Sequence, residues 1–401
     1  MFCRSLARAK SLLLRVVSVD VDHWLLATAK AAVVDTRVAI AVVGAGVPVG
    51  ECQLIIRYGK GPGDRNQVLR LFIWVLLSRA HHERYGWDHE AGKAVAFEDR
   101  CAHRHLPLSM GKLVGDALQC HYHGLRFGPD GRCVRIPGQD QIPQTAKIKT
   151  YLVVERYKWL WIWMGDPAAA DPAKITDFHW LDDSNWGAKT SYLHVKANWQ
   201  LVVDNLLDLT HLAFVHETTI GNAALAERAT VKVTRSPNNV VVTRWIIDQQ
   251  PPPTFKKVGG FKGNVDRWQI IDFAPPAFLR LDVGACPTGT GAPEGHRGDG
   301  INMRNLNAIT PETEKTSHYF WGQAHDFDVK NVETTEKIFH EIEKAFHEDV
   351  EVFSAQQRNL DLIPDPPQLD INADAGVTQA RRILASMHEK EQSTLHPAAA
   401  Q

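Results

Sequence analysis

Two short segments of the chain bring cysteine and histidine side chains close together. Cys101 and His103 lie in the first segment, and Cys120 and His123 lie in the second, with sixteen residues between the two segments. Thiolates are soft ligands for iron or zinc, and imidazole suits both metals. Four such ligands fit a tetrahedral zinc site, or a [2Fe–2S] cluster with two cysteines on one iron and two histidines on the other. Zinc hairpins usually pair like ligands, so the mixed order favours the iron–sulfur cluster.

Two further histidines, His211 and His216, lie in the segment Asp204–His216. This spacing can direct two imidazoles to one metal, provided that the backbone loosens after the first. Two histidines and one carboxylate form the facial triad of oxygen-activating Fe(II), which leaves positions open for dioxygen and substrate. Without a third ligand, such a pair is also typical of core or surface histidines. The spacing leaves five acidic residues open as that ligand: Glu341, Glu343, Glu348, Asp349 and Glu351.

The elements that must position these residues fall into two regions. From Lys93 onward, short β-rich runs alternate with Gly, Pro and Asp turn signals, which predicts a small antiparallel β domain. The segment Tyr151–Met164 is apolar on both faces of a strand, so we expect one buried strand there. A linker rich in proline, alanine and aspartate follows at residues 166–174.

The second region mixes helices and strands. Apolar residues spaced by three and four predict helices at 198–216 and at about 334–358. Between these helices, the sequence predicts strands at 230–234, 240–247, 268–273 and 278–283. The expected fold class is therefore α+β, with an all-β domain followed by an antiparallel sheet with helices.

Composition narrows the class of protein. The 401 residues suffice for two or three domains with sizeable cores, and the net charge of −1 excludes bulk attraction to nucleic acid or an anionic membrane. Six scattered cysteines do not form a secreted disulfide framework, so we expect reduced thiols in the cytoplasm. No apolar run reaches the roughly 20 residues of a spanning helix. The chain also lacks a flavin or nicotinamide fingerprint.

Residues 1–80 differ from the rest of the chain. They hold eleven Lys or Arg against five Asp or Glu, and their short apolar bursts keep no sustained period. Their fold is not readable, and we expect them to form an atypical segment outside the β domain.

Several motifs together resemble a known family. The C-x-H and C-x-x-H loops followed by DNLLDLTHLAFVH resemble the oxygenase (alpha) component of Rieske non-haem iron oxygenases. Within that family, WQLVVDNLLDLTHLAFVH, DRWQIIDFAPP, YFWG, FHEDVEVFSAQQRNL and INADAGVTQARRIL are similar to the vanillate O-demethylase branch. The resemblance covers roughly residues 90–390. It implies a Rieske [2Fe–2S] domain at 81–165, a helix-grip catalytic domain at 175–390 and a tail at 391–401.

The resemblance also implies roles for single residues. Asp208 would be the carboxylate that links the cluster histidine of a neighbouring subunit to an iron-ligand histidine, and Asn205 matches a position near the iron. Two departures from the family pattern, Ala102 in place of proline and His105, lie beside the cluster ligands. The implied cluster ligands are Cys101, His103, Cys120 and His123, and the implied Fe(II) ligands are His211, His216 and Asp349.

The implied activity is oxidative O-demethylation of a methoxylated aromatic such as vanillate. O2 would be the co-substrate, and NAD(P)H electrons would arrive through a separate flavin and iron–sulfur reductase. The resemblance further implies a cytoplasmic homotrimer. The same metals would also serve a ring-dihydroxylating dioxygenase, an N-demethylase or a methyl hydroxylase. Other classes remain open: an electron-transfer Rieske protein, a zinc-binding module, or a chain whose displaced N-terminus prevents cluster assembly.

The sequence does not identify the substrate. Arg267 and Arg304 are candidate contacts for a substrate carboxylate, with solvated arginine as the alternative for both. Trp245, Trp268 and Trp321 are expected to be core residues rather than substrate contacts.

Overall fold

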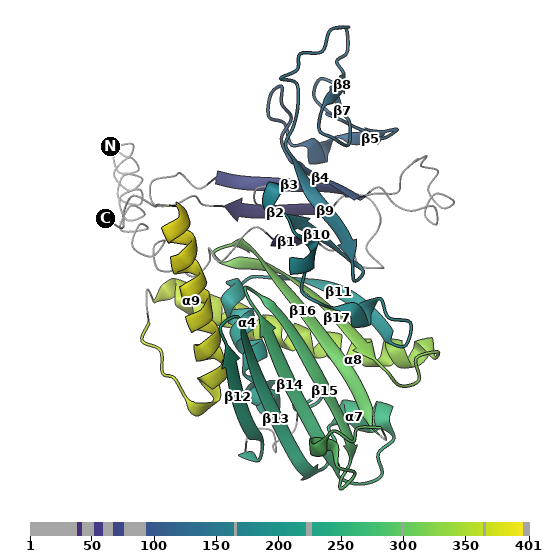
Figure 1. Ribbon diagram of the computed structural model, residues 1–401, viewed down its shortest axis with the longest axis vertical. Coiled ribbons are helices and arrows are strands. Elements are labelled where there is room, and N and C mark those ends of the chain that lie inside the picture. Colours follow the sequence, from purple (N-terminus) through teal and green to yellow (C-terminus); the bar gives the residue numbers. More distant parts are fainter. Residues whose placement is uncertain are drawn as a thin grey trace, which may run out of the picture.

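Three parts are stacked along the long axis of the molecule (Figure 1). A small β lobe lies at the top, a six-stranded sheet lies below it, and a larger sheet with helices forms the lower half. The computed structural model describes residues 38–41, 52–58, 67–75, 94–163, 167–221, 227–298, 300–363 and 366–395. Within these residues, no helix is both long and apolar enough to span a membrane.

Half of the strands of the six-stranded sheet lie within residues 1–80, where the sequence predicted no fold. All its neighbouring strands pair antiparallel, in the order β1-β10-β9-β4-β3-β2. The sheet therefore extends beyond the boundary expected at residue 81, and the remainder of residues 1–80 lies outside the described residues. The strands are β1 (Val38–Ala41), β2 (Cys52–Tyr58), β3 (Gln67–Val75), β4 (Ala94–Glu98), β9 (Thr150–Arg156) and β10 (Trp159–Trp163).

The prediction of one buried strand at Tyr151–Met164 is wrong, because the chain forms the hairpin β9–β10 there. Tyr157 and Lys158 make the two-residue turn with φ angles of 60° and 58°. Such turns usually contain Asn or Gly, which adopt positive φ readily, so the sequence carries no turn signal at this point. All five residues of β10 are buried, as expected for a strand that is apolar on both faces.

The lobe at the top of Figure 1 is an excursion between two adjacent strands. It leaves the sheet after β4 and returns at β9, and these strands pair directly through Ala96–Tyr151 and Phe97–Thr150. At the base of the lobe, the buried Asp99 carboxylate accepts hydrogen bonds from the N–H and hydroxyl of Ser109, at 2.7 and 2.8 Å. The elements of the lobe are η1 (Leu108–Met110), β5 (Lys112–Val114), β6 (Ala117–Gln119), β7 (Arg126–Phe127) and β8 (Cys133–Arg135).

The larger sheet is antiparallel, in the order β11-β17-β16-β15-β14-β13-β12. The four strands predicted from sequence are confirmed as β12 to β15, whereas β11, β16 and β17 were not predicted. Burial alternates along β13, as it must in a strand with one face on the core. The strands are β11 (Gly187–Val195), β12 (Thr230–Ser236), β13 (Asn239–Gln249), β14 (Val265–Ala274), β15 (Phe278–Pro287), β16 (Ile301–Thr313) and β17 (Thr316–His325).

Helices cover one face of this sheet. The longest, α8 (Val332–Leu362), begins at Asn331, whose side chain accepts a hydrogen bond from the backbone N–H of Glu333. Its apolar stripe faces the sheet, which confirms the predicted helix and extends it at both ends. The remaining helical elements of the described residues are η2 (Pro167–Ala169), η3 (Pro172–Lys174), η4 (His179–Leu181), α4 (Trp199–Leu207), η5 (Leu209–His211), α5 (Leu212–Val215), α7 (Pro253–Gly259), η6 (Ala292–Glu294), η7 (Asn372–Asp374) and α9 (Ala375–Leu395). Of these, the η4 turn lies on the opposite face, where Leu181 packs with Trp159 and Phe320.

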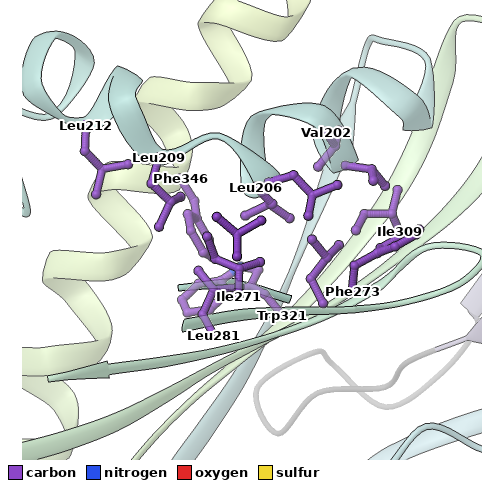
Figure 2. Packing of buried hydrophobic residues seen from close by; sticks show 14 of the residues in the cluster. Val202, Leu206, Leu209, Leu212, Ile271, Phe273, Leu281, Ile309, Trp321 and Phe346 are labelled. Atoms are coloured by element: carbon purple, nitrogen blue, oxygen red, sulfur yellow. The ribbon is translucent and has the colours of Figure 1, made fainter. Parts of the chain in front are cut away.

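The main core lies between the helices and the inner face of the sheet. Figure 2 shows Leu206 of α4 above Ile271 of β14, with Phe346 of α8 beside it, and Val202 of α4 on the side of Ile309 and Phe273. Trp321 stacks on Phe339 of α8 at 4.8 Å between ring centroids. This core holds the helices against the sheet and so determines where their polar side chains point.

Removing a core side chain tests this packing. Ile309→Ala deletes a side chain that is 3% exposed, so we expect the domain of the larger sheet to lose about 2–5 kcal/mol of unfolding free energy. The matched control Val231→Ala removes an apolar side chain that is 48% exposed, and we expect a change within about 0.5 kcal/mol. Calorimetric unfolding of both variants measures the difference, and equal losses would contradict the assigned core.

Candidate metal centres

The predicted helix at 198–216 is interrupted at Asp208. The helix α4 ends at Leu207, and Asp208 has extended backbone angles, φ −118° and ψ 99°. The Asp208 carboxylate then caps the next turn, accepting hydrogen bonds from the N–H and hydroxyl of Thr210 at 2.9 and 2.8 Å. The backbone therefore loosens before His211 rather than after it.

Hydrogen bonds orient both histidines, and the break provides the acceptor for one of them. His211 Nδ1 donates to the main-chain oxygen of Asp208 at 2.7 Å. His216 Nδ1 donates to Glu348 Oε2 on α8, also at 2.7 Å. A histidine whose Nδ1 donates a proton presents Nε2 as a lone pair, which is the form that binds metal.

Both Nε2 atoms point at one carboxylate. Asp349 Oδ1 lies 3.1 Å from His216 Nε2 and 3.5 Å from His211 Nε2, and one ligand atom from each residue fits within 4.8 Å of the others. Asn205 Nδ2 donates to the same oxygen at 3.3 Å. Of the five carboxylates left open by the sequence, Asp349 is the one that the fold brings to both histidines, and Glu341 instead pairs with Lys257.

Electrostatics support a metal at this point. Burial lowers the pKa of His211 despite the nearby Asp349, so this imidazole is neutral and can bind a cation. Burial also opposes charge on His216, but its hydrogen bonds to Asp349 and Glu348 outweigh this effect and raise its pKa. Metal binding at these residues would compete with protonation of His216, because a ligand imidazole must present Nε2 without its proton. Two imidazoles and one carboxylate are the ligands that non-haem Fe(II) prefers.

The contact between Asp208 and His211 differs from the one implied by the family resemblance. In the arrangement that the resemblance implies, the Asp208 carboxylate itself contacts an iron-ligand imidazole. In this structure the main-chain oxygen of Asp208, not its carboxylate, accepts the hydrogen bond from His211. The carboxylate bonds to Thr210, lies 4.0 Å from Arg244, and is 20% exposed. It therefore keeps one side toward the surface, and its part in electron transfer stays a prediction.

The cysteine and histidine loops of the lobe have the same backbone turn. The N–H of Cys101 bonds to the oxygen of Leu106, and the N–H of Cys120 bonds to that of Leu125, at 2.9 and 2.8 Å. The fourth residue after each cysteine has positive φ, 59° at His105 and 72° at Gly124. A left-handed backbone costs a histidine more than a glycine, so His105 is a strained position in an exposed loop.

The four donor atoms of these loops form two separate pairs. The buried thiol of Cys101 contacts that of Cys120, and burial together with this contact raises the pKa of Cys101 to about 11. His103 Nδ1 and His123 Nδ1 face each other at 3.2 Å on the exposed side. A single zinc ion would gather all four donors, but within the described residues only the His211, His216 and Asp349 set converges in this way. Two pairs fit a two-iron cluster with split ligation.

Comparison with known proteins agrees with both centres. Residues 75–151 match the Rieske [2Fe-2S] domain, and residues 195–390 match the Vanillate O-demethylase oxygenase C-terminal domain. The chain therefore belongs to the Rieske non-haem iron oxygenases, in the branch of vanillate O-demethylase oxygenase subunits. Members of this family are oxidoreductases that use the [2Fe–2S] cluster, a mononuclear non-haem iron and O2.

Similar proteins include subunits of several monooxygenases. The chain is 46% identical to the toluene-4-sulfonate monooxygenase system iron-sulfur subunit of Comamonas testosteroni, over 76% of this chain and 89% of that protein. It is 37% identical to a vanillate O-demethylase oxygenase subunit of Pseudomonas sp., over 75% and 86%. The crystal structure of dicamba monooxygenase bound to 3,6-dichlorosalicylic acid matches with a TM-score of 0.77 and 27% identity, over 90% and 99%.

A pocket opens beside His211, His216 and Asp349. The helices and strands β14 to β16 line it mainly with apolar side chains, and these three residues form part of the same lining. Arg267 lines this pocket, whereas Arg304 pairs with Asp282 at 2.7 Å and does not line it. Trp321 is confirmed as a core residue, and Trp268, fully buried, packs with Trp245 outside the pocket lining.

Sequence reasoning missed the role of Glu348. The sequence indicated Glu348 only as one possible metal ligand, but in the structure its carboxylate accepts a hydrogen bond from His216 Nδ1. Its position directly before Asp349 is the available signal, because successive residues of a helix point in different directions and can serve the ligand set from two sides.

Removing an iron ligand tests the mononuclear site. We expect His211→Ala to lower the iron content from roughly three to roughly two atoms per chain, because the cluster keeps its own ligands. Iron analysis together with the spectrum of the reduced cluster measures both centres. Glu351→Ala, an exposed carboxylate on the same helix, is the control and should keep all its iron. Loss of the cluster signal in His211→Ala would contradict two independent centres.

Removing the partner of a ligand tests the role of Glu348. We expect Glu348→Ala to weaken iron binding by about 10- to 100-fold, because His216 loses the acceptor that orients it. Glu348→Gln keeps an acceptor oxygen and should fall between this variant and the wild type. Competition with a chelator measures the affinity, and an unchanged affinity in Glu348→Ala would remove this role.

Proposed function

We propose that this chain is the oxygenase component of a multicomponent monooxygenase that hydroxylates a methyl carbon attached to an aromatic ring, directly or through oxygen. The observation that carries the proposal is the convergence of two Nε2 atoms and one carboxylate at an apolar pocket. In this proposal His211, His216 and Asp349 hold the iron. Cys101, His103, Cys120 and His123 hold the cluster.

The bound iron would supply activation of dioxygen, with electrons passed from the cluster. The balanced reaction takes one methyl group, O2, two electrons and two protons to one hydroxymethyl group and one water. Leu206, Leu209 and Phe346 form apolar walls that exclude water from the reacting carbon. Asn205 holds Asp349 through its hydrogen bond and so keeps this oxygen on the side of the two imidazoles.

Two methyl-bearing substrate classes are candidates. An aryl-methyl group is the first, because the relatives that share 46% and 45% identity are named as toluene-4-sulfonate monooxygenase subunits, the second as putative. A methoxy group is the second, as the family resemblance implied, because vanillate O-demethylase subunits share 37% and 35% identity. Hydroxylation of a methoxy carbon gives a hemiacetal that collapses to a phenol and formaldehyde.

Electron delivery between subunits accounts for the position of the lobe. The lobe projects from the end of the molecule that lies away from α7 and the lower part of the large sheet (Figure 1). In a homotrimer, the exposed imidazoles of one subunit would meet the partly exposed Asp208 of the next. A separate reductase would supply the electrons from NAD(P)H. A pure electron-transfer protein would not need the convergent His211, His216 and Asp349 set.

Product analysis tests the proposed activity. The purified protein, with a surrogate ferredoxin-type reductase and NADH, is incubated under ¹⁸O2 with toluene-4-sulfonate or with vanillate. We expect one labelled oxygen in a hydroxymethyl product from the first, or formaldehyde from the second. A ring cis-diol with two labelled oxygens would instead indicate a dioxygenase, and no turnover by an iron-loaded protein would contradict the proposal.

A cluster signature tests the electron-transfer half. The dithionite-reduced protein should give the electron paramagnetic resonance spectrum of a cluster with one histidine-bound iron, which differs from that of all-cysteine clusters. His123→Ala should lose this spectrum while keeping the mononuclear iron. A colourless protein that contains zinc would overturn the cluster assignment.

A further inference from the structure

Arg267 places a positive charge inside the pocket. It lies on the inner face of β14, is 4% exposed, and lines the same pocket as the iron-ligand set. Its Nε and Nη1 atoms are buried and have no hydrogen-bond partner. A buried guanidinium with unused N–H groups is unfavourable unless something else compensates it, because buried charges are normally paired.

The surroundings of Arg267 do not supply the missing negative charge. Its guanidinium lies over the Phe255 ring, 4.8 Å from the centroid, and its charged neighbour is a second cation, Arg244 on the adjacent strand. Burial, together with Arg244, lowers the pKa of Arg267 to about 9, so the side chain is still charged at neutral pH. A negative charge that neutralises the Arg267 guanidinium would therefore come from a molecule bound in the pocket.

Other arginines on or beside this sheet show the usual arrangement. Arg280 pairs with Asp272, Arg297 with Asp282, and Arg304 also with Asp282. Arg267 lacks such a partner and is the arginine that lines the pocket. The unpaired cation therefore coincides with the place where a substrate would enter.

We propose that the Arg267 guanidinium is the receptor for the anionic group, a carboxylate or a sulfonate, of the aromatic substrate. The planar guanidinium presents several N–H donors, and both anions offer oxygen pairs that match them. This inference rests on the proposed function, because it takes the pocket as the site of oxidation. To the proposed function it adds the charge of the substrate and the residue that recognises this charge.

The two walls of the pocket then have different tasks. Arg267 belongs to the sheet wall, whereas His211, His216 and Asp349 belong to the helix wall. A ring held by its anionic end on the sheet presents its other end to the metal ligands. Substrates with the methyl or methoxy group across the ring from the charge fit this arrangement.

Binding without turnover tests the inference. The iron-loaded protein, kept anaerobic and without reductase, is titrated calorimetrically with toluene-4-sulfonate and with 4-methoxybenzoate. The neutral counterparts are toluene-4-sulfonamide and 4-methoxybenzamide. We expect at least one anion to bind about tenfold or more tightly than its neutral counterpart, and the tighter of the two anions identifies the preferred head group. Equal binding of anion and amide, or no binding of either anion, overturns the proposal.

Three variants test the residue. Arg267→Met, similar in length but uncharged, should lose the preference for the anion, Arg267→Lys should keep part of it, and the control Arg304→Met should keep all of it. Persistence of the preference in Arg267→Met overturns the assignment.

A stability measurement separates recognition from a structural role. If Arg267 serves the ligand, the ligand-free Arg267→Met protein should melt about 2 °C or more above the wild type, because an uncompensated buried charge has been removed. A lower melting temperature would show that Arg267 supports the fold, and would overturn the proposal. The wild-type comparison of anion and amide decides the matter even if the variant does not fold.

The inference and the proposed function can fail separately. Arg267-dependent binding of an anion that is never oxidised would support the receptor and contradict the monooxygenase. Oxidation of anionic and neutral methylarenes at equal rates, in both the wild type and Arg267→Met, would support the monooxygenase and contradict the receptor.

Discussion

The extended backbone at Asp208 is the constraint on which the candidate metal centre of His211, His216 and Asp349 depends. In a continuous helix the main-chain oxygen of Asp208 would accept from the N–H four residues later. Here that N–H, on Leu212, bonds to Leu209 and Thr210 instead, and the freed oxygen accepts from His211 Nδ1. One backbone distortion thus orients a ligand that a regular helix would leave unsupported.

The packing between the helices and the larger sheet determines where the charged residues of the pocket lie. The core between α4, α8 and the sheet places Asp349 under two imidazoles and leaves Arg267 facing an apolar space. The carboxylate of Asp349 therefore belongs to α8 and the guanidinium of Arg267 to β14, so a local rearrangement does not pair the two charges. Rigid packing preserves this separation, because side chains in a dense core have few alternative positions.

Local features of the sites could be predicted from the sequence, whereas features that depend on tertiary contacts could not. The cysteine and histidine pairs lie within a few residues of each other, so their spacing alone predicts a metal site. Asp349 is 133 residues from His216, and spacing could not distinguish it from its acidic neighbours on α8. The strand β16 carries Asn305 and Asn307 on its inner face, where alternation would require apolar residues. The hairpin turn at Tyr157 lacked the usual residues.

The path of the chain through the lobe has a consequence for how the domain could have diversified. Residues 99–149 leave β4 and return at β9, and the two strands pair directly beneath them. The ends of the excursion are therefore neighbours held by a sheet that does not itself contribute cluster ligands. Such an insertion can be exchanged for one of different length or redox potential without disturbing the strand order, so the electron carrier behaves as an interchangeable module on a constant frame.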